Sequence, residues 1–141
     1  MARTLESHLT TRVTKRVEEE LGEVARAKGI TPRALARTLI EEGLRRERHP
    51  GIIFRDGPAG RRAAIEGRRL DVWQVMDTVW ASDGDIESAA SYLGLRPDQV
   101  RSAVSYYADY PDEIDEWSRR NLEEAERLQA AHEREQAALS R

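Results

Sequence analysis

The chain has 141 residues, of which 35% are charged and only 6% are aromatic. This length and composition favour one ordinary domain or two small helical modules, and they argue against a large enzyme core. The absence of cysteine excludes disulfides, cysteine nucleophiles and thiolate metal sites.

No apolar run approaches the roughly 20 residues that span a bilayer, and the first residues lack the hydrophobic core of a signal peptide. We therefore expect a cytoplasmic protein without membrane contact. The formal net charge of -3 is unevenly spread: residues 1–70 carry 16 Lys and Arg and 10 Asp and Glu, whereas residues 71–141 carry 7 and 16. A basic first half suits phosphates and an acidic second half suits a cationic protein, although charge runs are usually solvated faces.

Residues 7–14 alternate in polarity, which predicts one short strand with two different faces. One face would carry Leu9, Thr11 and Val13. The other would carry His8, Thr10 and Arg12.

Two capped amphipathic helices are predicted after this strand. Thr14 is a plausible N-cap for the first helix, and Gly29 offers a left-handed stop. Thr31 followed by Pro32 predicts the start of the second helix, whose apolar face continues up to Arg46. The apolar positions of the two helices are Val17, Leu21, Val24, Ala25, Leu35, Leu39, Ile40 and Leu44.

One strand and two helices of this size bury too little apolar surface to fold alone, so this segment needs a second copy. Antiparallel pairing of the two strands would form a ribbon that can enter a DNA major groove. The residues of the first third of the chain resemble the ribbon-helix-helix family of DNA-binding dimers, which includes bacterial repressors and antitoxins. The resemblance implies that His8, Thr10 and Arg12 read bases, and that the helix start at Thr31 and Arg33 holds a phosphate.

One residue departs from the family's pattern, and one alternative interpretation stays open. Pro32 removes one backbone donor from the phosphate anchor, although the amides of Arg33 and Ala34 remain. The alternative is an ordinary helical hairpin with a frayed N-terminus, in which Arg12 is simply solvated and His8 is an exposed bystander.

The segment His49-Pro50-Gly51 predicts the end of the second helix and a domain boundary. A hairpin is predicted next, with residues 52–54 and 61–65 on either side of the turn at residues 56–60. Helical periodicity returns at Asp71, and we expect Trp73 and Trp80 to pack in the core of this part.

Residues 86–93, Gly94 and residues 97–107 have the spacing of a helix-turn-helix, and Asp85 can cap its first helix. Its second helix exposes few cations, so we expect it to contact protein rather than DNA. Gln99 and Arg101 are the residues that would reverse this expectation.

Residues 49–116 resemble a small bacterial domain of unknown function, numbered 433. The resemblance is carried by His49-Pro50-Gly51-Ile52, residues 61–65, Asp71-Val72-Trp73 and the run from Asp85 to Tyr110-Pro111-Asp112-Glu113-Ile114. It implies an antitoxin component encoded beside a nuclease-type toxin. Where many members carry a Gly-Lys-Pro-Val-Ile-type strand, this chain has Gly60-Arg61-Arg62-Ala63-Ala64-Ile65.

A last helix is predicted from Pro111 toward the C-terminus, with acidic residues in its first turns. Beyond Leu128 the sequence is alanine-rich and charged, so we expect it to be helical only in part or only when bound. Trp117, Leu122 and Leu128 are candidate anchors in a partner's groove. The alternative is an ordinary terminal helix packed on its own domain.

Nothing in the sequence points to an enzyme, a metal or a cofactor. The three histidines, His8, His49 and His132, are not at ligand spacing, and no nucleophile motif surrounds a serine. Paired carboxylates lie in helical acidic runs, where solvation is the simpler interpretation.

The sequence therefore predicts a mainly helical protein with three parts: a ribbon-helix-helix module at 1–48, a helix-turn-helix-like domain at 49–116 and a helical tail at 117–141. We expect a homodimer, or a higher even oligomer, that binds double-stranded operator DNA through the first part and a toxin through the acidic half. One alternative is a protein-interaction adaptor whose ribbon only dimerises. A second alternative moves DNA binding to Gln99 and Arg101.

Overall fold

The computed structural model describes residues 5–140 and is mainly helical, with one two-stranded antiparallel sheet in this part of the chain. The chain divides into two compact units, residues 1–44 and residues 45–141. This division falls inside a helix, whereas the sequence-based boundary at 48/49 lies where that helix ends. No helix within residues 5–140 is long and apolar enough to cross a membrane.

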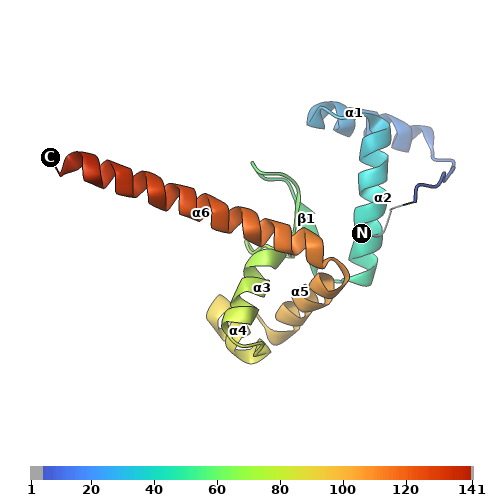
Figure 1. The fold of residues 1–141 in the computed structure, drawn as a ribbon. Coiled ribbons are helices and arrows are strands. Elements are labelled where there is room, and N and C mark those ends of the chain that lie inside the picture. Colours follow the sequence, from blue (N-terminus) through green and yellow to red (C-terminus); the bar gives the residue numbers. More distant parts are fainter. Residues whose placement is uncertain (1–4, 141) are drawn as a thin grey trace. The chain divides into compact units, whose positions relative to one another are not determined.

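The first unit contains α1 (Lys15–Lys28) and most of α2 (Pro32–Arg48), as Figure 1 shows in blue and cyan. Thr14 Oγ1 accepts a hydrogen bond from the Val17 amide at 3.2 Å, and Gly29 has a φ of 70° that ends α1. Thr31 Oγ1 accepts from the Ala34 amide at 3.1 Å at the start of α2. The predicted helix starts and the glycine stop are confirmed, and α2 runs two residues beyond the expected Arg46.

Residues 5–14 form no strand in this single chain. A strand is held by hydrogen bonds to a neighbouring strand, and the partner predicted for this segment is a second copy. The ribbon therefore stays a prediction.

The second unit begins with the last turn of α2 and continues into the hairpin of β1 (Ile52–Arg55) and β2 (Arg62–Ile65). The strands pair antiparallel, with Ile52 opposite Ile65 and Arg55 opposite Arg62. Gly57 and Gly60 exchange backbone hydrogen bonds of 3.0 Å in both directions, which closes the turn. The predicted hairpin is thus confirmed.

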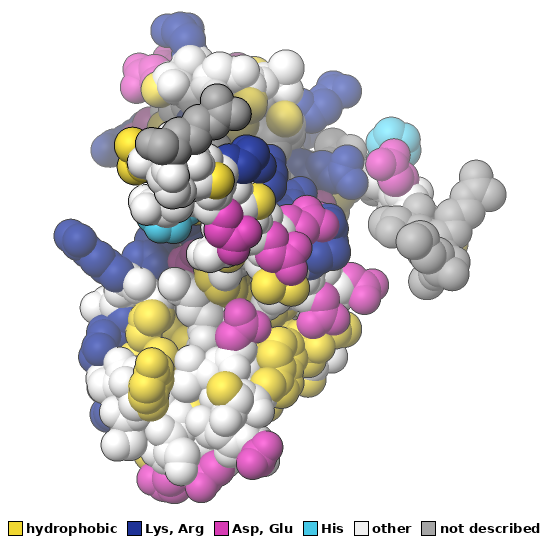
Figure 2. Space-filling model, turned by 60° about the vertical axis from the view of Figure 1, so that its left-hand side comes forward, with side chains coloured by type: hydrophobic (Ala, Val, Ile, Leu, Met, Phe, Trp, Pro, Cys, Tyr) yellow, Lys and Arg dark blue, Asp and Glu magenta, His cyan; other side chains and the backbone are white. Residues whose placement is uncertain are grey.

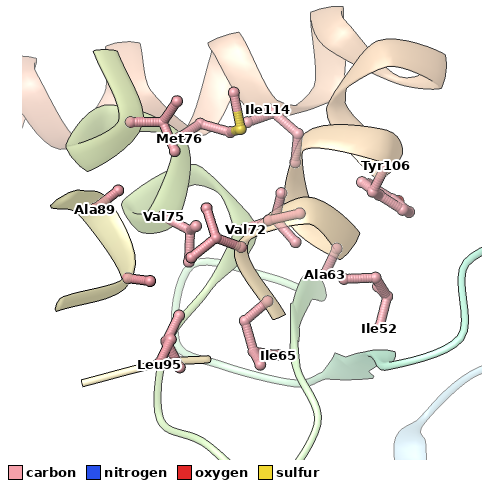
Figure 3. Packing of buried hydrophobic residues seen from close by; sticks show 14 residues of the cluster. Ile52, Ala63, Ile65, Val72, Val75, Met76, Ala89, Leu95, Tyr106 and Ile114 are labelled. Carbon is pink, nitrogen blue, oxygen red and sulfur yellow. The ribbon is translucent and has the colours of Figure 1, made fainter. Parts of the chain in front are cut away.

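Four helices complete this unit: α3 (Val72–Ala81), α4 (Ile86–Leu93), α5 (Pro97–Asp109) and α6 (Pro111–Leu139). Asp85 caps α4, and Gly94 has the left-handed φ of 66° that lets the chain turn into α5. One apolar cluster joins the hairpin to all four helices (Figure 3). Its fully buried members include Ile52, Ile65, Val72, Val75, Val100, Tyr106 and Ile114.

The prediction that both tryptophans of α3 lie in the core is wrong for Trp80, which is 44% exposed and meets the Tyr107 ring edge-on at 5.2 Å. Trp73 is only partly buried and packs against the core from its margin. The buried stripe of α3 follows Val72, Val75, Met76 and Val79, and both tryptophans lie about a quarter turn to one side of that stripe.

Helix α6 is continuous to Leu139, so the expected loss of helix beyond Leu128 is not seen. Only its first turns pack on the domain, chiefly through Ile114, and Figure 1 shows the remainder extending away from the other helices of this unit. From residue 119 onward every described side chain except that of Ala131 is exposed. Ion pairs between successive turns, among them Arg119 with Glu116 and Glu123, support the exposed helix.

Candidate nucleic-acid interface

The three predicted base-reading residues are open to solvent. His8, Thr10 and Arg12 are all exposed in the segment without regular secondary structure that precedes α1. Arg12 makes no ion pair with any described residue, whereas the neighbouring Glu6 lies 3.5 Å from Arg37. A guanidinium in this position is free to meet a guanine or a phosphate.

The opposite face of the same segment is open as well. Leu9 is 78% exposed and Val13 is 55% exposed, so neither has a core to cover it in the single chain. Apolar side chains that alternate with polar ones in this way usually pack against a partner surface. The segment therefore has the alternating pattern of a strand, and the side chains of both its faces are exposed to solvent.

The predicted phosphate anchor is partly altered by its own cap. Thr31 and Arg33 are exposed at the first turn of α2. The expectation that the Ala34 amide remains available is wrong, because it donates to Thr31 Oγ1. Pro32 has no amide proton, so the Arg33 amide and guanidinium are left to meet a phosphate at this helix start.

The first unit lacks a core of its own. Among its described residues only Ala25 and Leu35 are buried. Nine of its large apolar side chains are between 42% and 87% exposed: Leu5, Leu9, Val13, Val17, Val24, Ile30, Leu39, Ile40 and Leu44. Figure 2 shows one face of the molecule, on which hydrophobic side chains lie among charged ones. So many exposed apolar side chains on one small unit are typical of an interface.

The basic character of the first half does not come from this unit. Residues 1–44 carry 8 Lys and Arg and 7 Asp and Glu, which is close to balance. Residues 45–70 carry 8 arginines against 3 acidic residues. The excess of positive charge therefore follows the end of α2 and the hairpin.

In the helix-turn-helix-like part, the side chain of Gln99 is engaged in a helix cap. Its Oε1 accepts a hydrogen bond from the Arg96 amide at 2.9 Å, which caps the start of α5. Arg101, two residues further along α5, is exposed. Of the two residues that would read DNA from this helix, Gln99 is therefore held by a local hydrogen bond, and Arg101, within the described residues, is not.

The candidate partner anchors on α6 differ in burial. Trp117 is partly buried, and the Arg120 guanidinium lies 5.2 Å from the centre of its ring. Leu122 and Leu128 are 60% and 62% exposed. The two leucines present apolar surface on a solvated helix, which is the arrangement expected of groove anchors.

Two polar clusters in the second unit were not anticipated from the sequence. Arg45 Nη1 donates to Tyr106 Oη and to Glu113 Oε1, both at 2.8 Å, and Tyr106 Oη donates to Glu113 Oε2 at 2.6 Å. Burial raises the pKa of the Tyr106 phenol well above its ordinary value, and the Glu113 carboxylate adds to this effect. The cluster ties the end of α2 to α5 and α6.

The second cluster has the composition of a catalytic triad. His49 is 4% exposed; its Nε2 lies 2.8 Å from Asp109 Oδ2 and its Nδ1 lies 3.3 Å from Ser105 Oγ. The imidazole also meets the Tyr106 and Tyr110 rings edge-on. These contacts satisfy a buried ring at the end of α2, which is a sufficient structural reason for the grouping. The sequence hints at this cluster only in the spacing of Ser105 and Asp109, which lie one helical turn apart.

The described residues contain no group of three or more histidine, cysteine or acidic side chains placed to hold a metal ion. No protein-family model, no curated protein and no solved structure matches the chain.

Proposed function

We propose that this chain is a DNA-binding transcriptional regulator that acts as a homodimer, and that it is the antitoxin of a type II toxin-antitoxin operon. The observation that carries the proposal is that the first unit combines an exposed apolar surface with a segment of alternating polarity that pairs with no strand among the described residues. A second copy would cover the apolar surface and would pair with the segment.

The proposed mechanism follows from pairing residues 7–14 of two copies in antiparallel fashion. Leu9 and Val13 would then face a shared core, while His8, Thr10 and Arg12 of each copy would face outward. A two-stranded ribbon fits the major groove, where an arginine can contact guanine with two hydrogen bonds. Arg33 at the start of α2 would fix the position of the dimer on a phosphate.

Toxin binding is assigned to the acidic half of the chain. Residues 71–141 carry 16 acidic and 7 basic side chains, which suits a cationic partner. Leu122 and Leu128 on α6 would be the apolar anchors, with Trp117 at the base of the helix. Binding of the toxin would then tune how much of the operator is occupied.

The decisive test is fluorescence anisotropy on DNA from the region upstream of the coding sequence, titrated over salt concentration. We expect Arg12→Ala to lose about 1 to 3 kcal/mol of specific binding and to relax sequence preference. Arg26→Ala is the matched control, since it removes the same charge from an exposed position in the last turn of α1. Equal affinity of the wild type and Arg12→Ala would refute the assignment of Arg12.

Dimerisation is tested separately by light scattering. We expect a mass of twice 16.1 kDa for the wild type. Leu39→Asp should shift the protein toward the monomer, because it places a charge on the exposed apolar face of α2. Leu122→Asp on α6 is the control, and a monomeric wild type at micromolar concentration would count against the whole proposal.

The second candidate is an adaptor whose ribbon only dimerises. It is favoured by the near balance of charge in residues 1–44, which supplies little general attraction for DNA. A dimer that fails to bind any DNA would select this function. If DNA binding persists in Arg12→Ala and is lost in a Gln99→Ala, Arg101→Ala double variant, α5 would be the reader instead.

A further inference from the structure

A cavity of about 790 Å³ lies in the second unit, against the hairpin, the start of α3 and one side of α6. This volume is within the range of pockets that hold small molecules. Its lining is rich in arginine and contains two tryptophans. Among the side chains that line it are Arg55, Arg62, Arg69, Asp71, Trp73 and Trp117.

One part of the cavity is organised by Asp71, which is 7% exposed. Its carboxylate accepts a hydrogen bond from Arg55 Nη2 at 3.1 Å and one from Trp73 Nε1 at 3.2 Å. Arg62 Nε lies 2.6 Å from the same carboxylate, but out of line for a hydrogen bond. Two guanidinium groups thus share one carboxylate, which leaves an excess positive charge.

One buried donor in this cluster lacks an acceptor. The Nε atoms of Arg55 and Arg62 are both buried and make no hydrogen bond with the described residues, but Arg62 Nε is paired with the Asp71 carboxylate, which leaves Arg55 Nε without a partner. Buried polar groups are nearly always paired, so such a donor marks a place where an acceptor is missing. An anion in the cavity would supply it.

The other charges of the lining leave the cavity positive. Each acidic side chain of the lining already has an arginine partner: Asp56 has Arg61, Asp71 has Arg55 and Arg62, Glu123 has Arg119 and Glu124 has Arg127. Arg69 makes no ion pair within the described part of the chain. Its charge is therefore available to a ligand.

The two tryptophans add a flat apolar surface. Trp117 lies beneath the hairpin turn, since a Cβ built on Gly60 would be 3.7 Å from its ring. Arg120 lies over the Trp117 ring at 5.2 Å. Tryptophan and arginine side chains together form the usual platform on which a nucleobase stacks.

We propose that this cavity binds a nucleoside monophosphate, with the phosphate held by Arg55, Arg62 and Arg69 and the base against Trp117. The inference rests on the second unit alone and does not depend on DNA binding by the first. A phosphate has more acceptor oxygens than a carboxylate, so one phosphate can meet several guanidinium groups at once.

The test is isothermal titration of the full chain at low salt with AMP, adenosine, ribose 5-phosphate and inorganic phosphate. We expect AMP to bind, and each fragment to bind at least about tenfold more weakly, because each lacks one of the two contacts. Arg69→Gln should weaken AMP binding by about tenfold, the usual effect of losing a charge-assisted hydrogen bond. Trp117→Leu should weaken AMP but leave ribose 5-phosphate unchanged.

Arg101→Gln is the matched control, because it removes an exposed arginine of the same unit that does not line the cavity. Equal losses in Arg69→Gln and Arg101→Gln would place the binding outside the cavity and overturn the proposal. Inorganic phosphate binding as tightly as AMP would overturn the assignment of the base. The absence of saturable AMP binding at about 1 mM would overturn the site itself.

Discussion

Tyr106 is the clearest place to test the packing of the second unit, because its phenol is buried and joins two charged groups. Tyr106→Phe removes the acceptor for Arg45 and the donor to Glu113 and leaves the ring in place. A hydrogen bond to a charged group usually contributes about 1.5 to 3 kcal/mol. Arg45 and Glu113 keep their own 2.8 Å contact and some access to water, so we expect a net loss of about 2 kcal/mol in the free energy of unfolding.

Tyr107→Phe provides the matched control. Its hydroxyl donates to Asp115 at 2.9 Å at the surface, so its loss should cost no more than about 0.5 kcal/mol. Urea unfolding followed by circular dichroism at one protein concentration gives both values, provided that the slope with urea stays the same. If Tyr106→Phe loses no more stability than Tyr107→Phe, the cluster around Arg45 does not stabilise the fold.

Three further results are expected from the same assay. Ile114→Ala should lose about 2 to 5 kcal/mol because it empties a core position of α6, whereas Leu128→Ala should change stability by less than about 0.5 kcal/mol. Because the pKa of Tyr106 is raised in the folded state, its contribution is complete below pH 10.0 and declines as the pH rises further, so Tyr106→Phe should flatten the alkaline loss of stability. The pKa of Asp85 is lowered by hydrogen bonds from the Ser88 amide and hydroxyl, so its contribution is present above pH 3.8 and is lost as the pH falls; Asp85→Asn should be less sensitive to acid.

The helix ends could be predicted from the sequence because they depend on residues within one turn. Thr14, Thr31 and Asp85 cap helices through their own side chains, and Gly29 and Gly94 adopt backbone angles that other residues rarely adopt. The hairpin was equally local, since its glycine-rich turn separates two apolar segments.

The polar clusters and the cavity could not be predicted, because they join residues far apart in the chain. Arg45 meets Tyr106 across 61 positions and Glu113 across 68, and no periodic pattern records such a pair. Trp80 was misplaced for a related reason: its helix has a narrow buried stripe, and the width of that stripe depends on neighbouring elements. The candidate base-reading face raises a different difficulty, because the partner strand that we propose for it would belong to a second copy of the chain.

The arginine-rich composition of the hairpin region has a consequence for regulation. Lysine occurs only at positions 15 and 28, so all the cationic side chains of the second unit are arginines. Arginine keeps its charge at every pH at which proteins fold, and acetylation of lysine does not touch it. The affinity of the cavity for an anion should therefore follow the ionisation of the ligand rather than that of the arginines, and amine-directed reagents should label the first unit while leaving the arginines of the cavity unchanged.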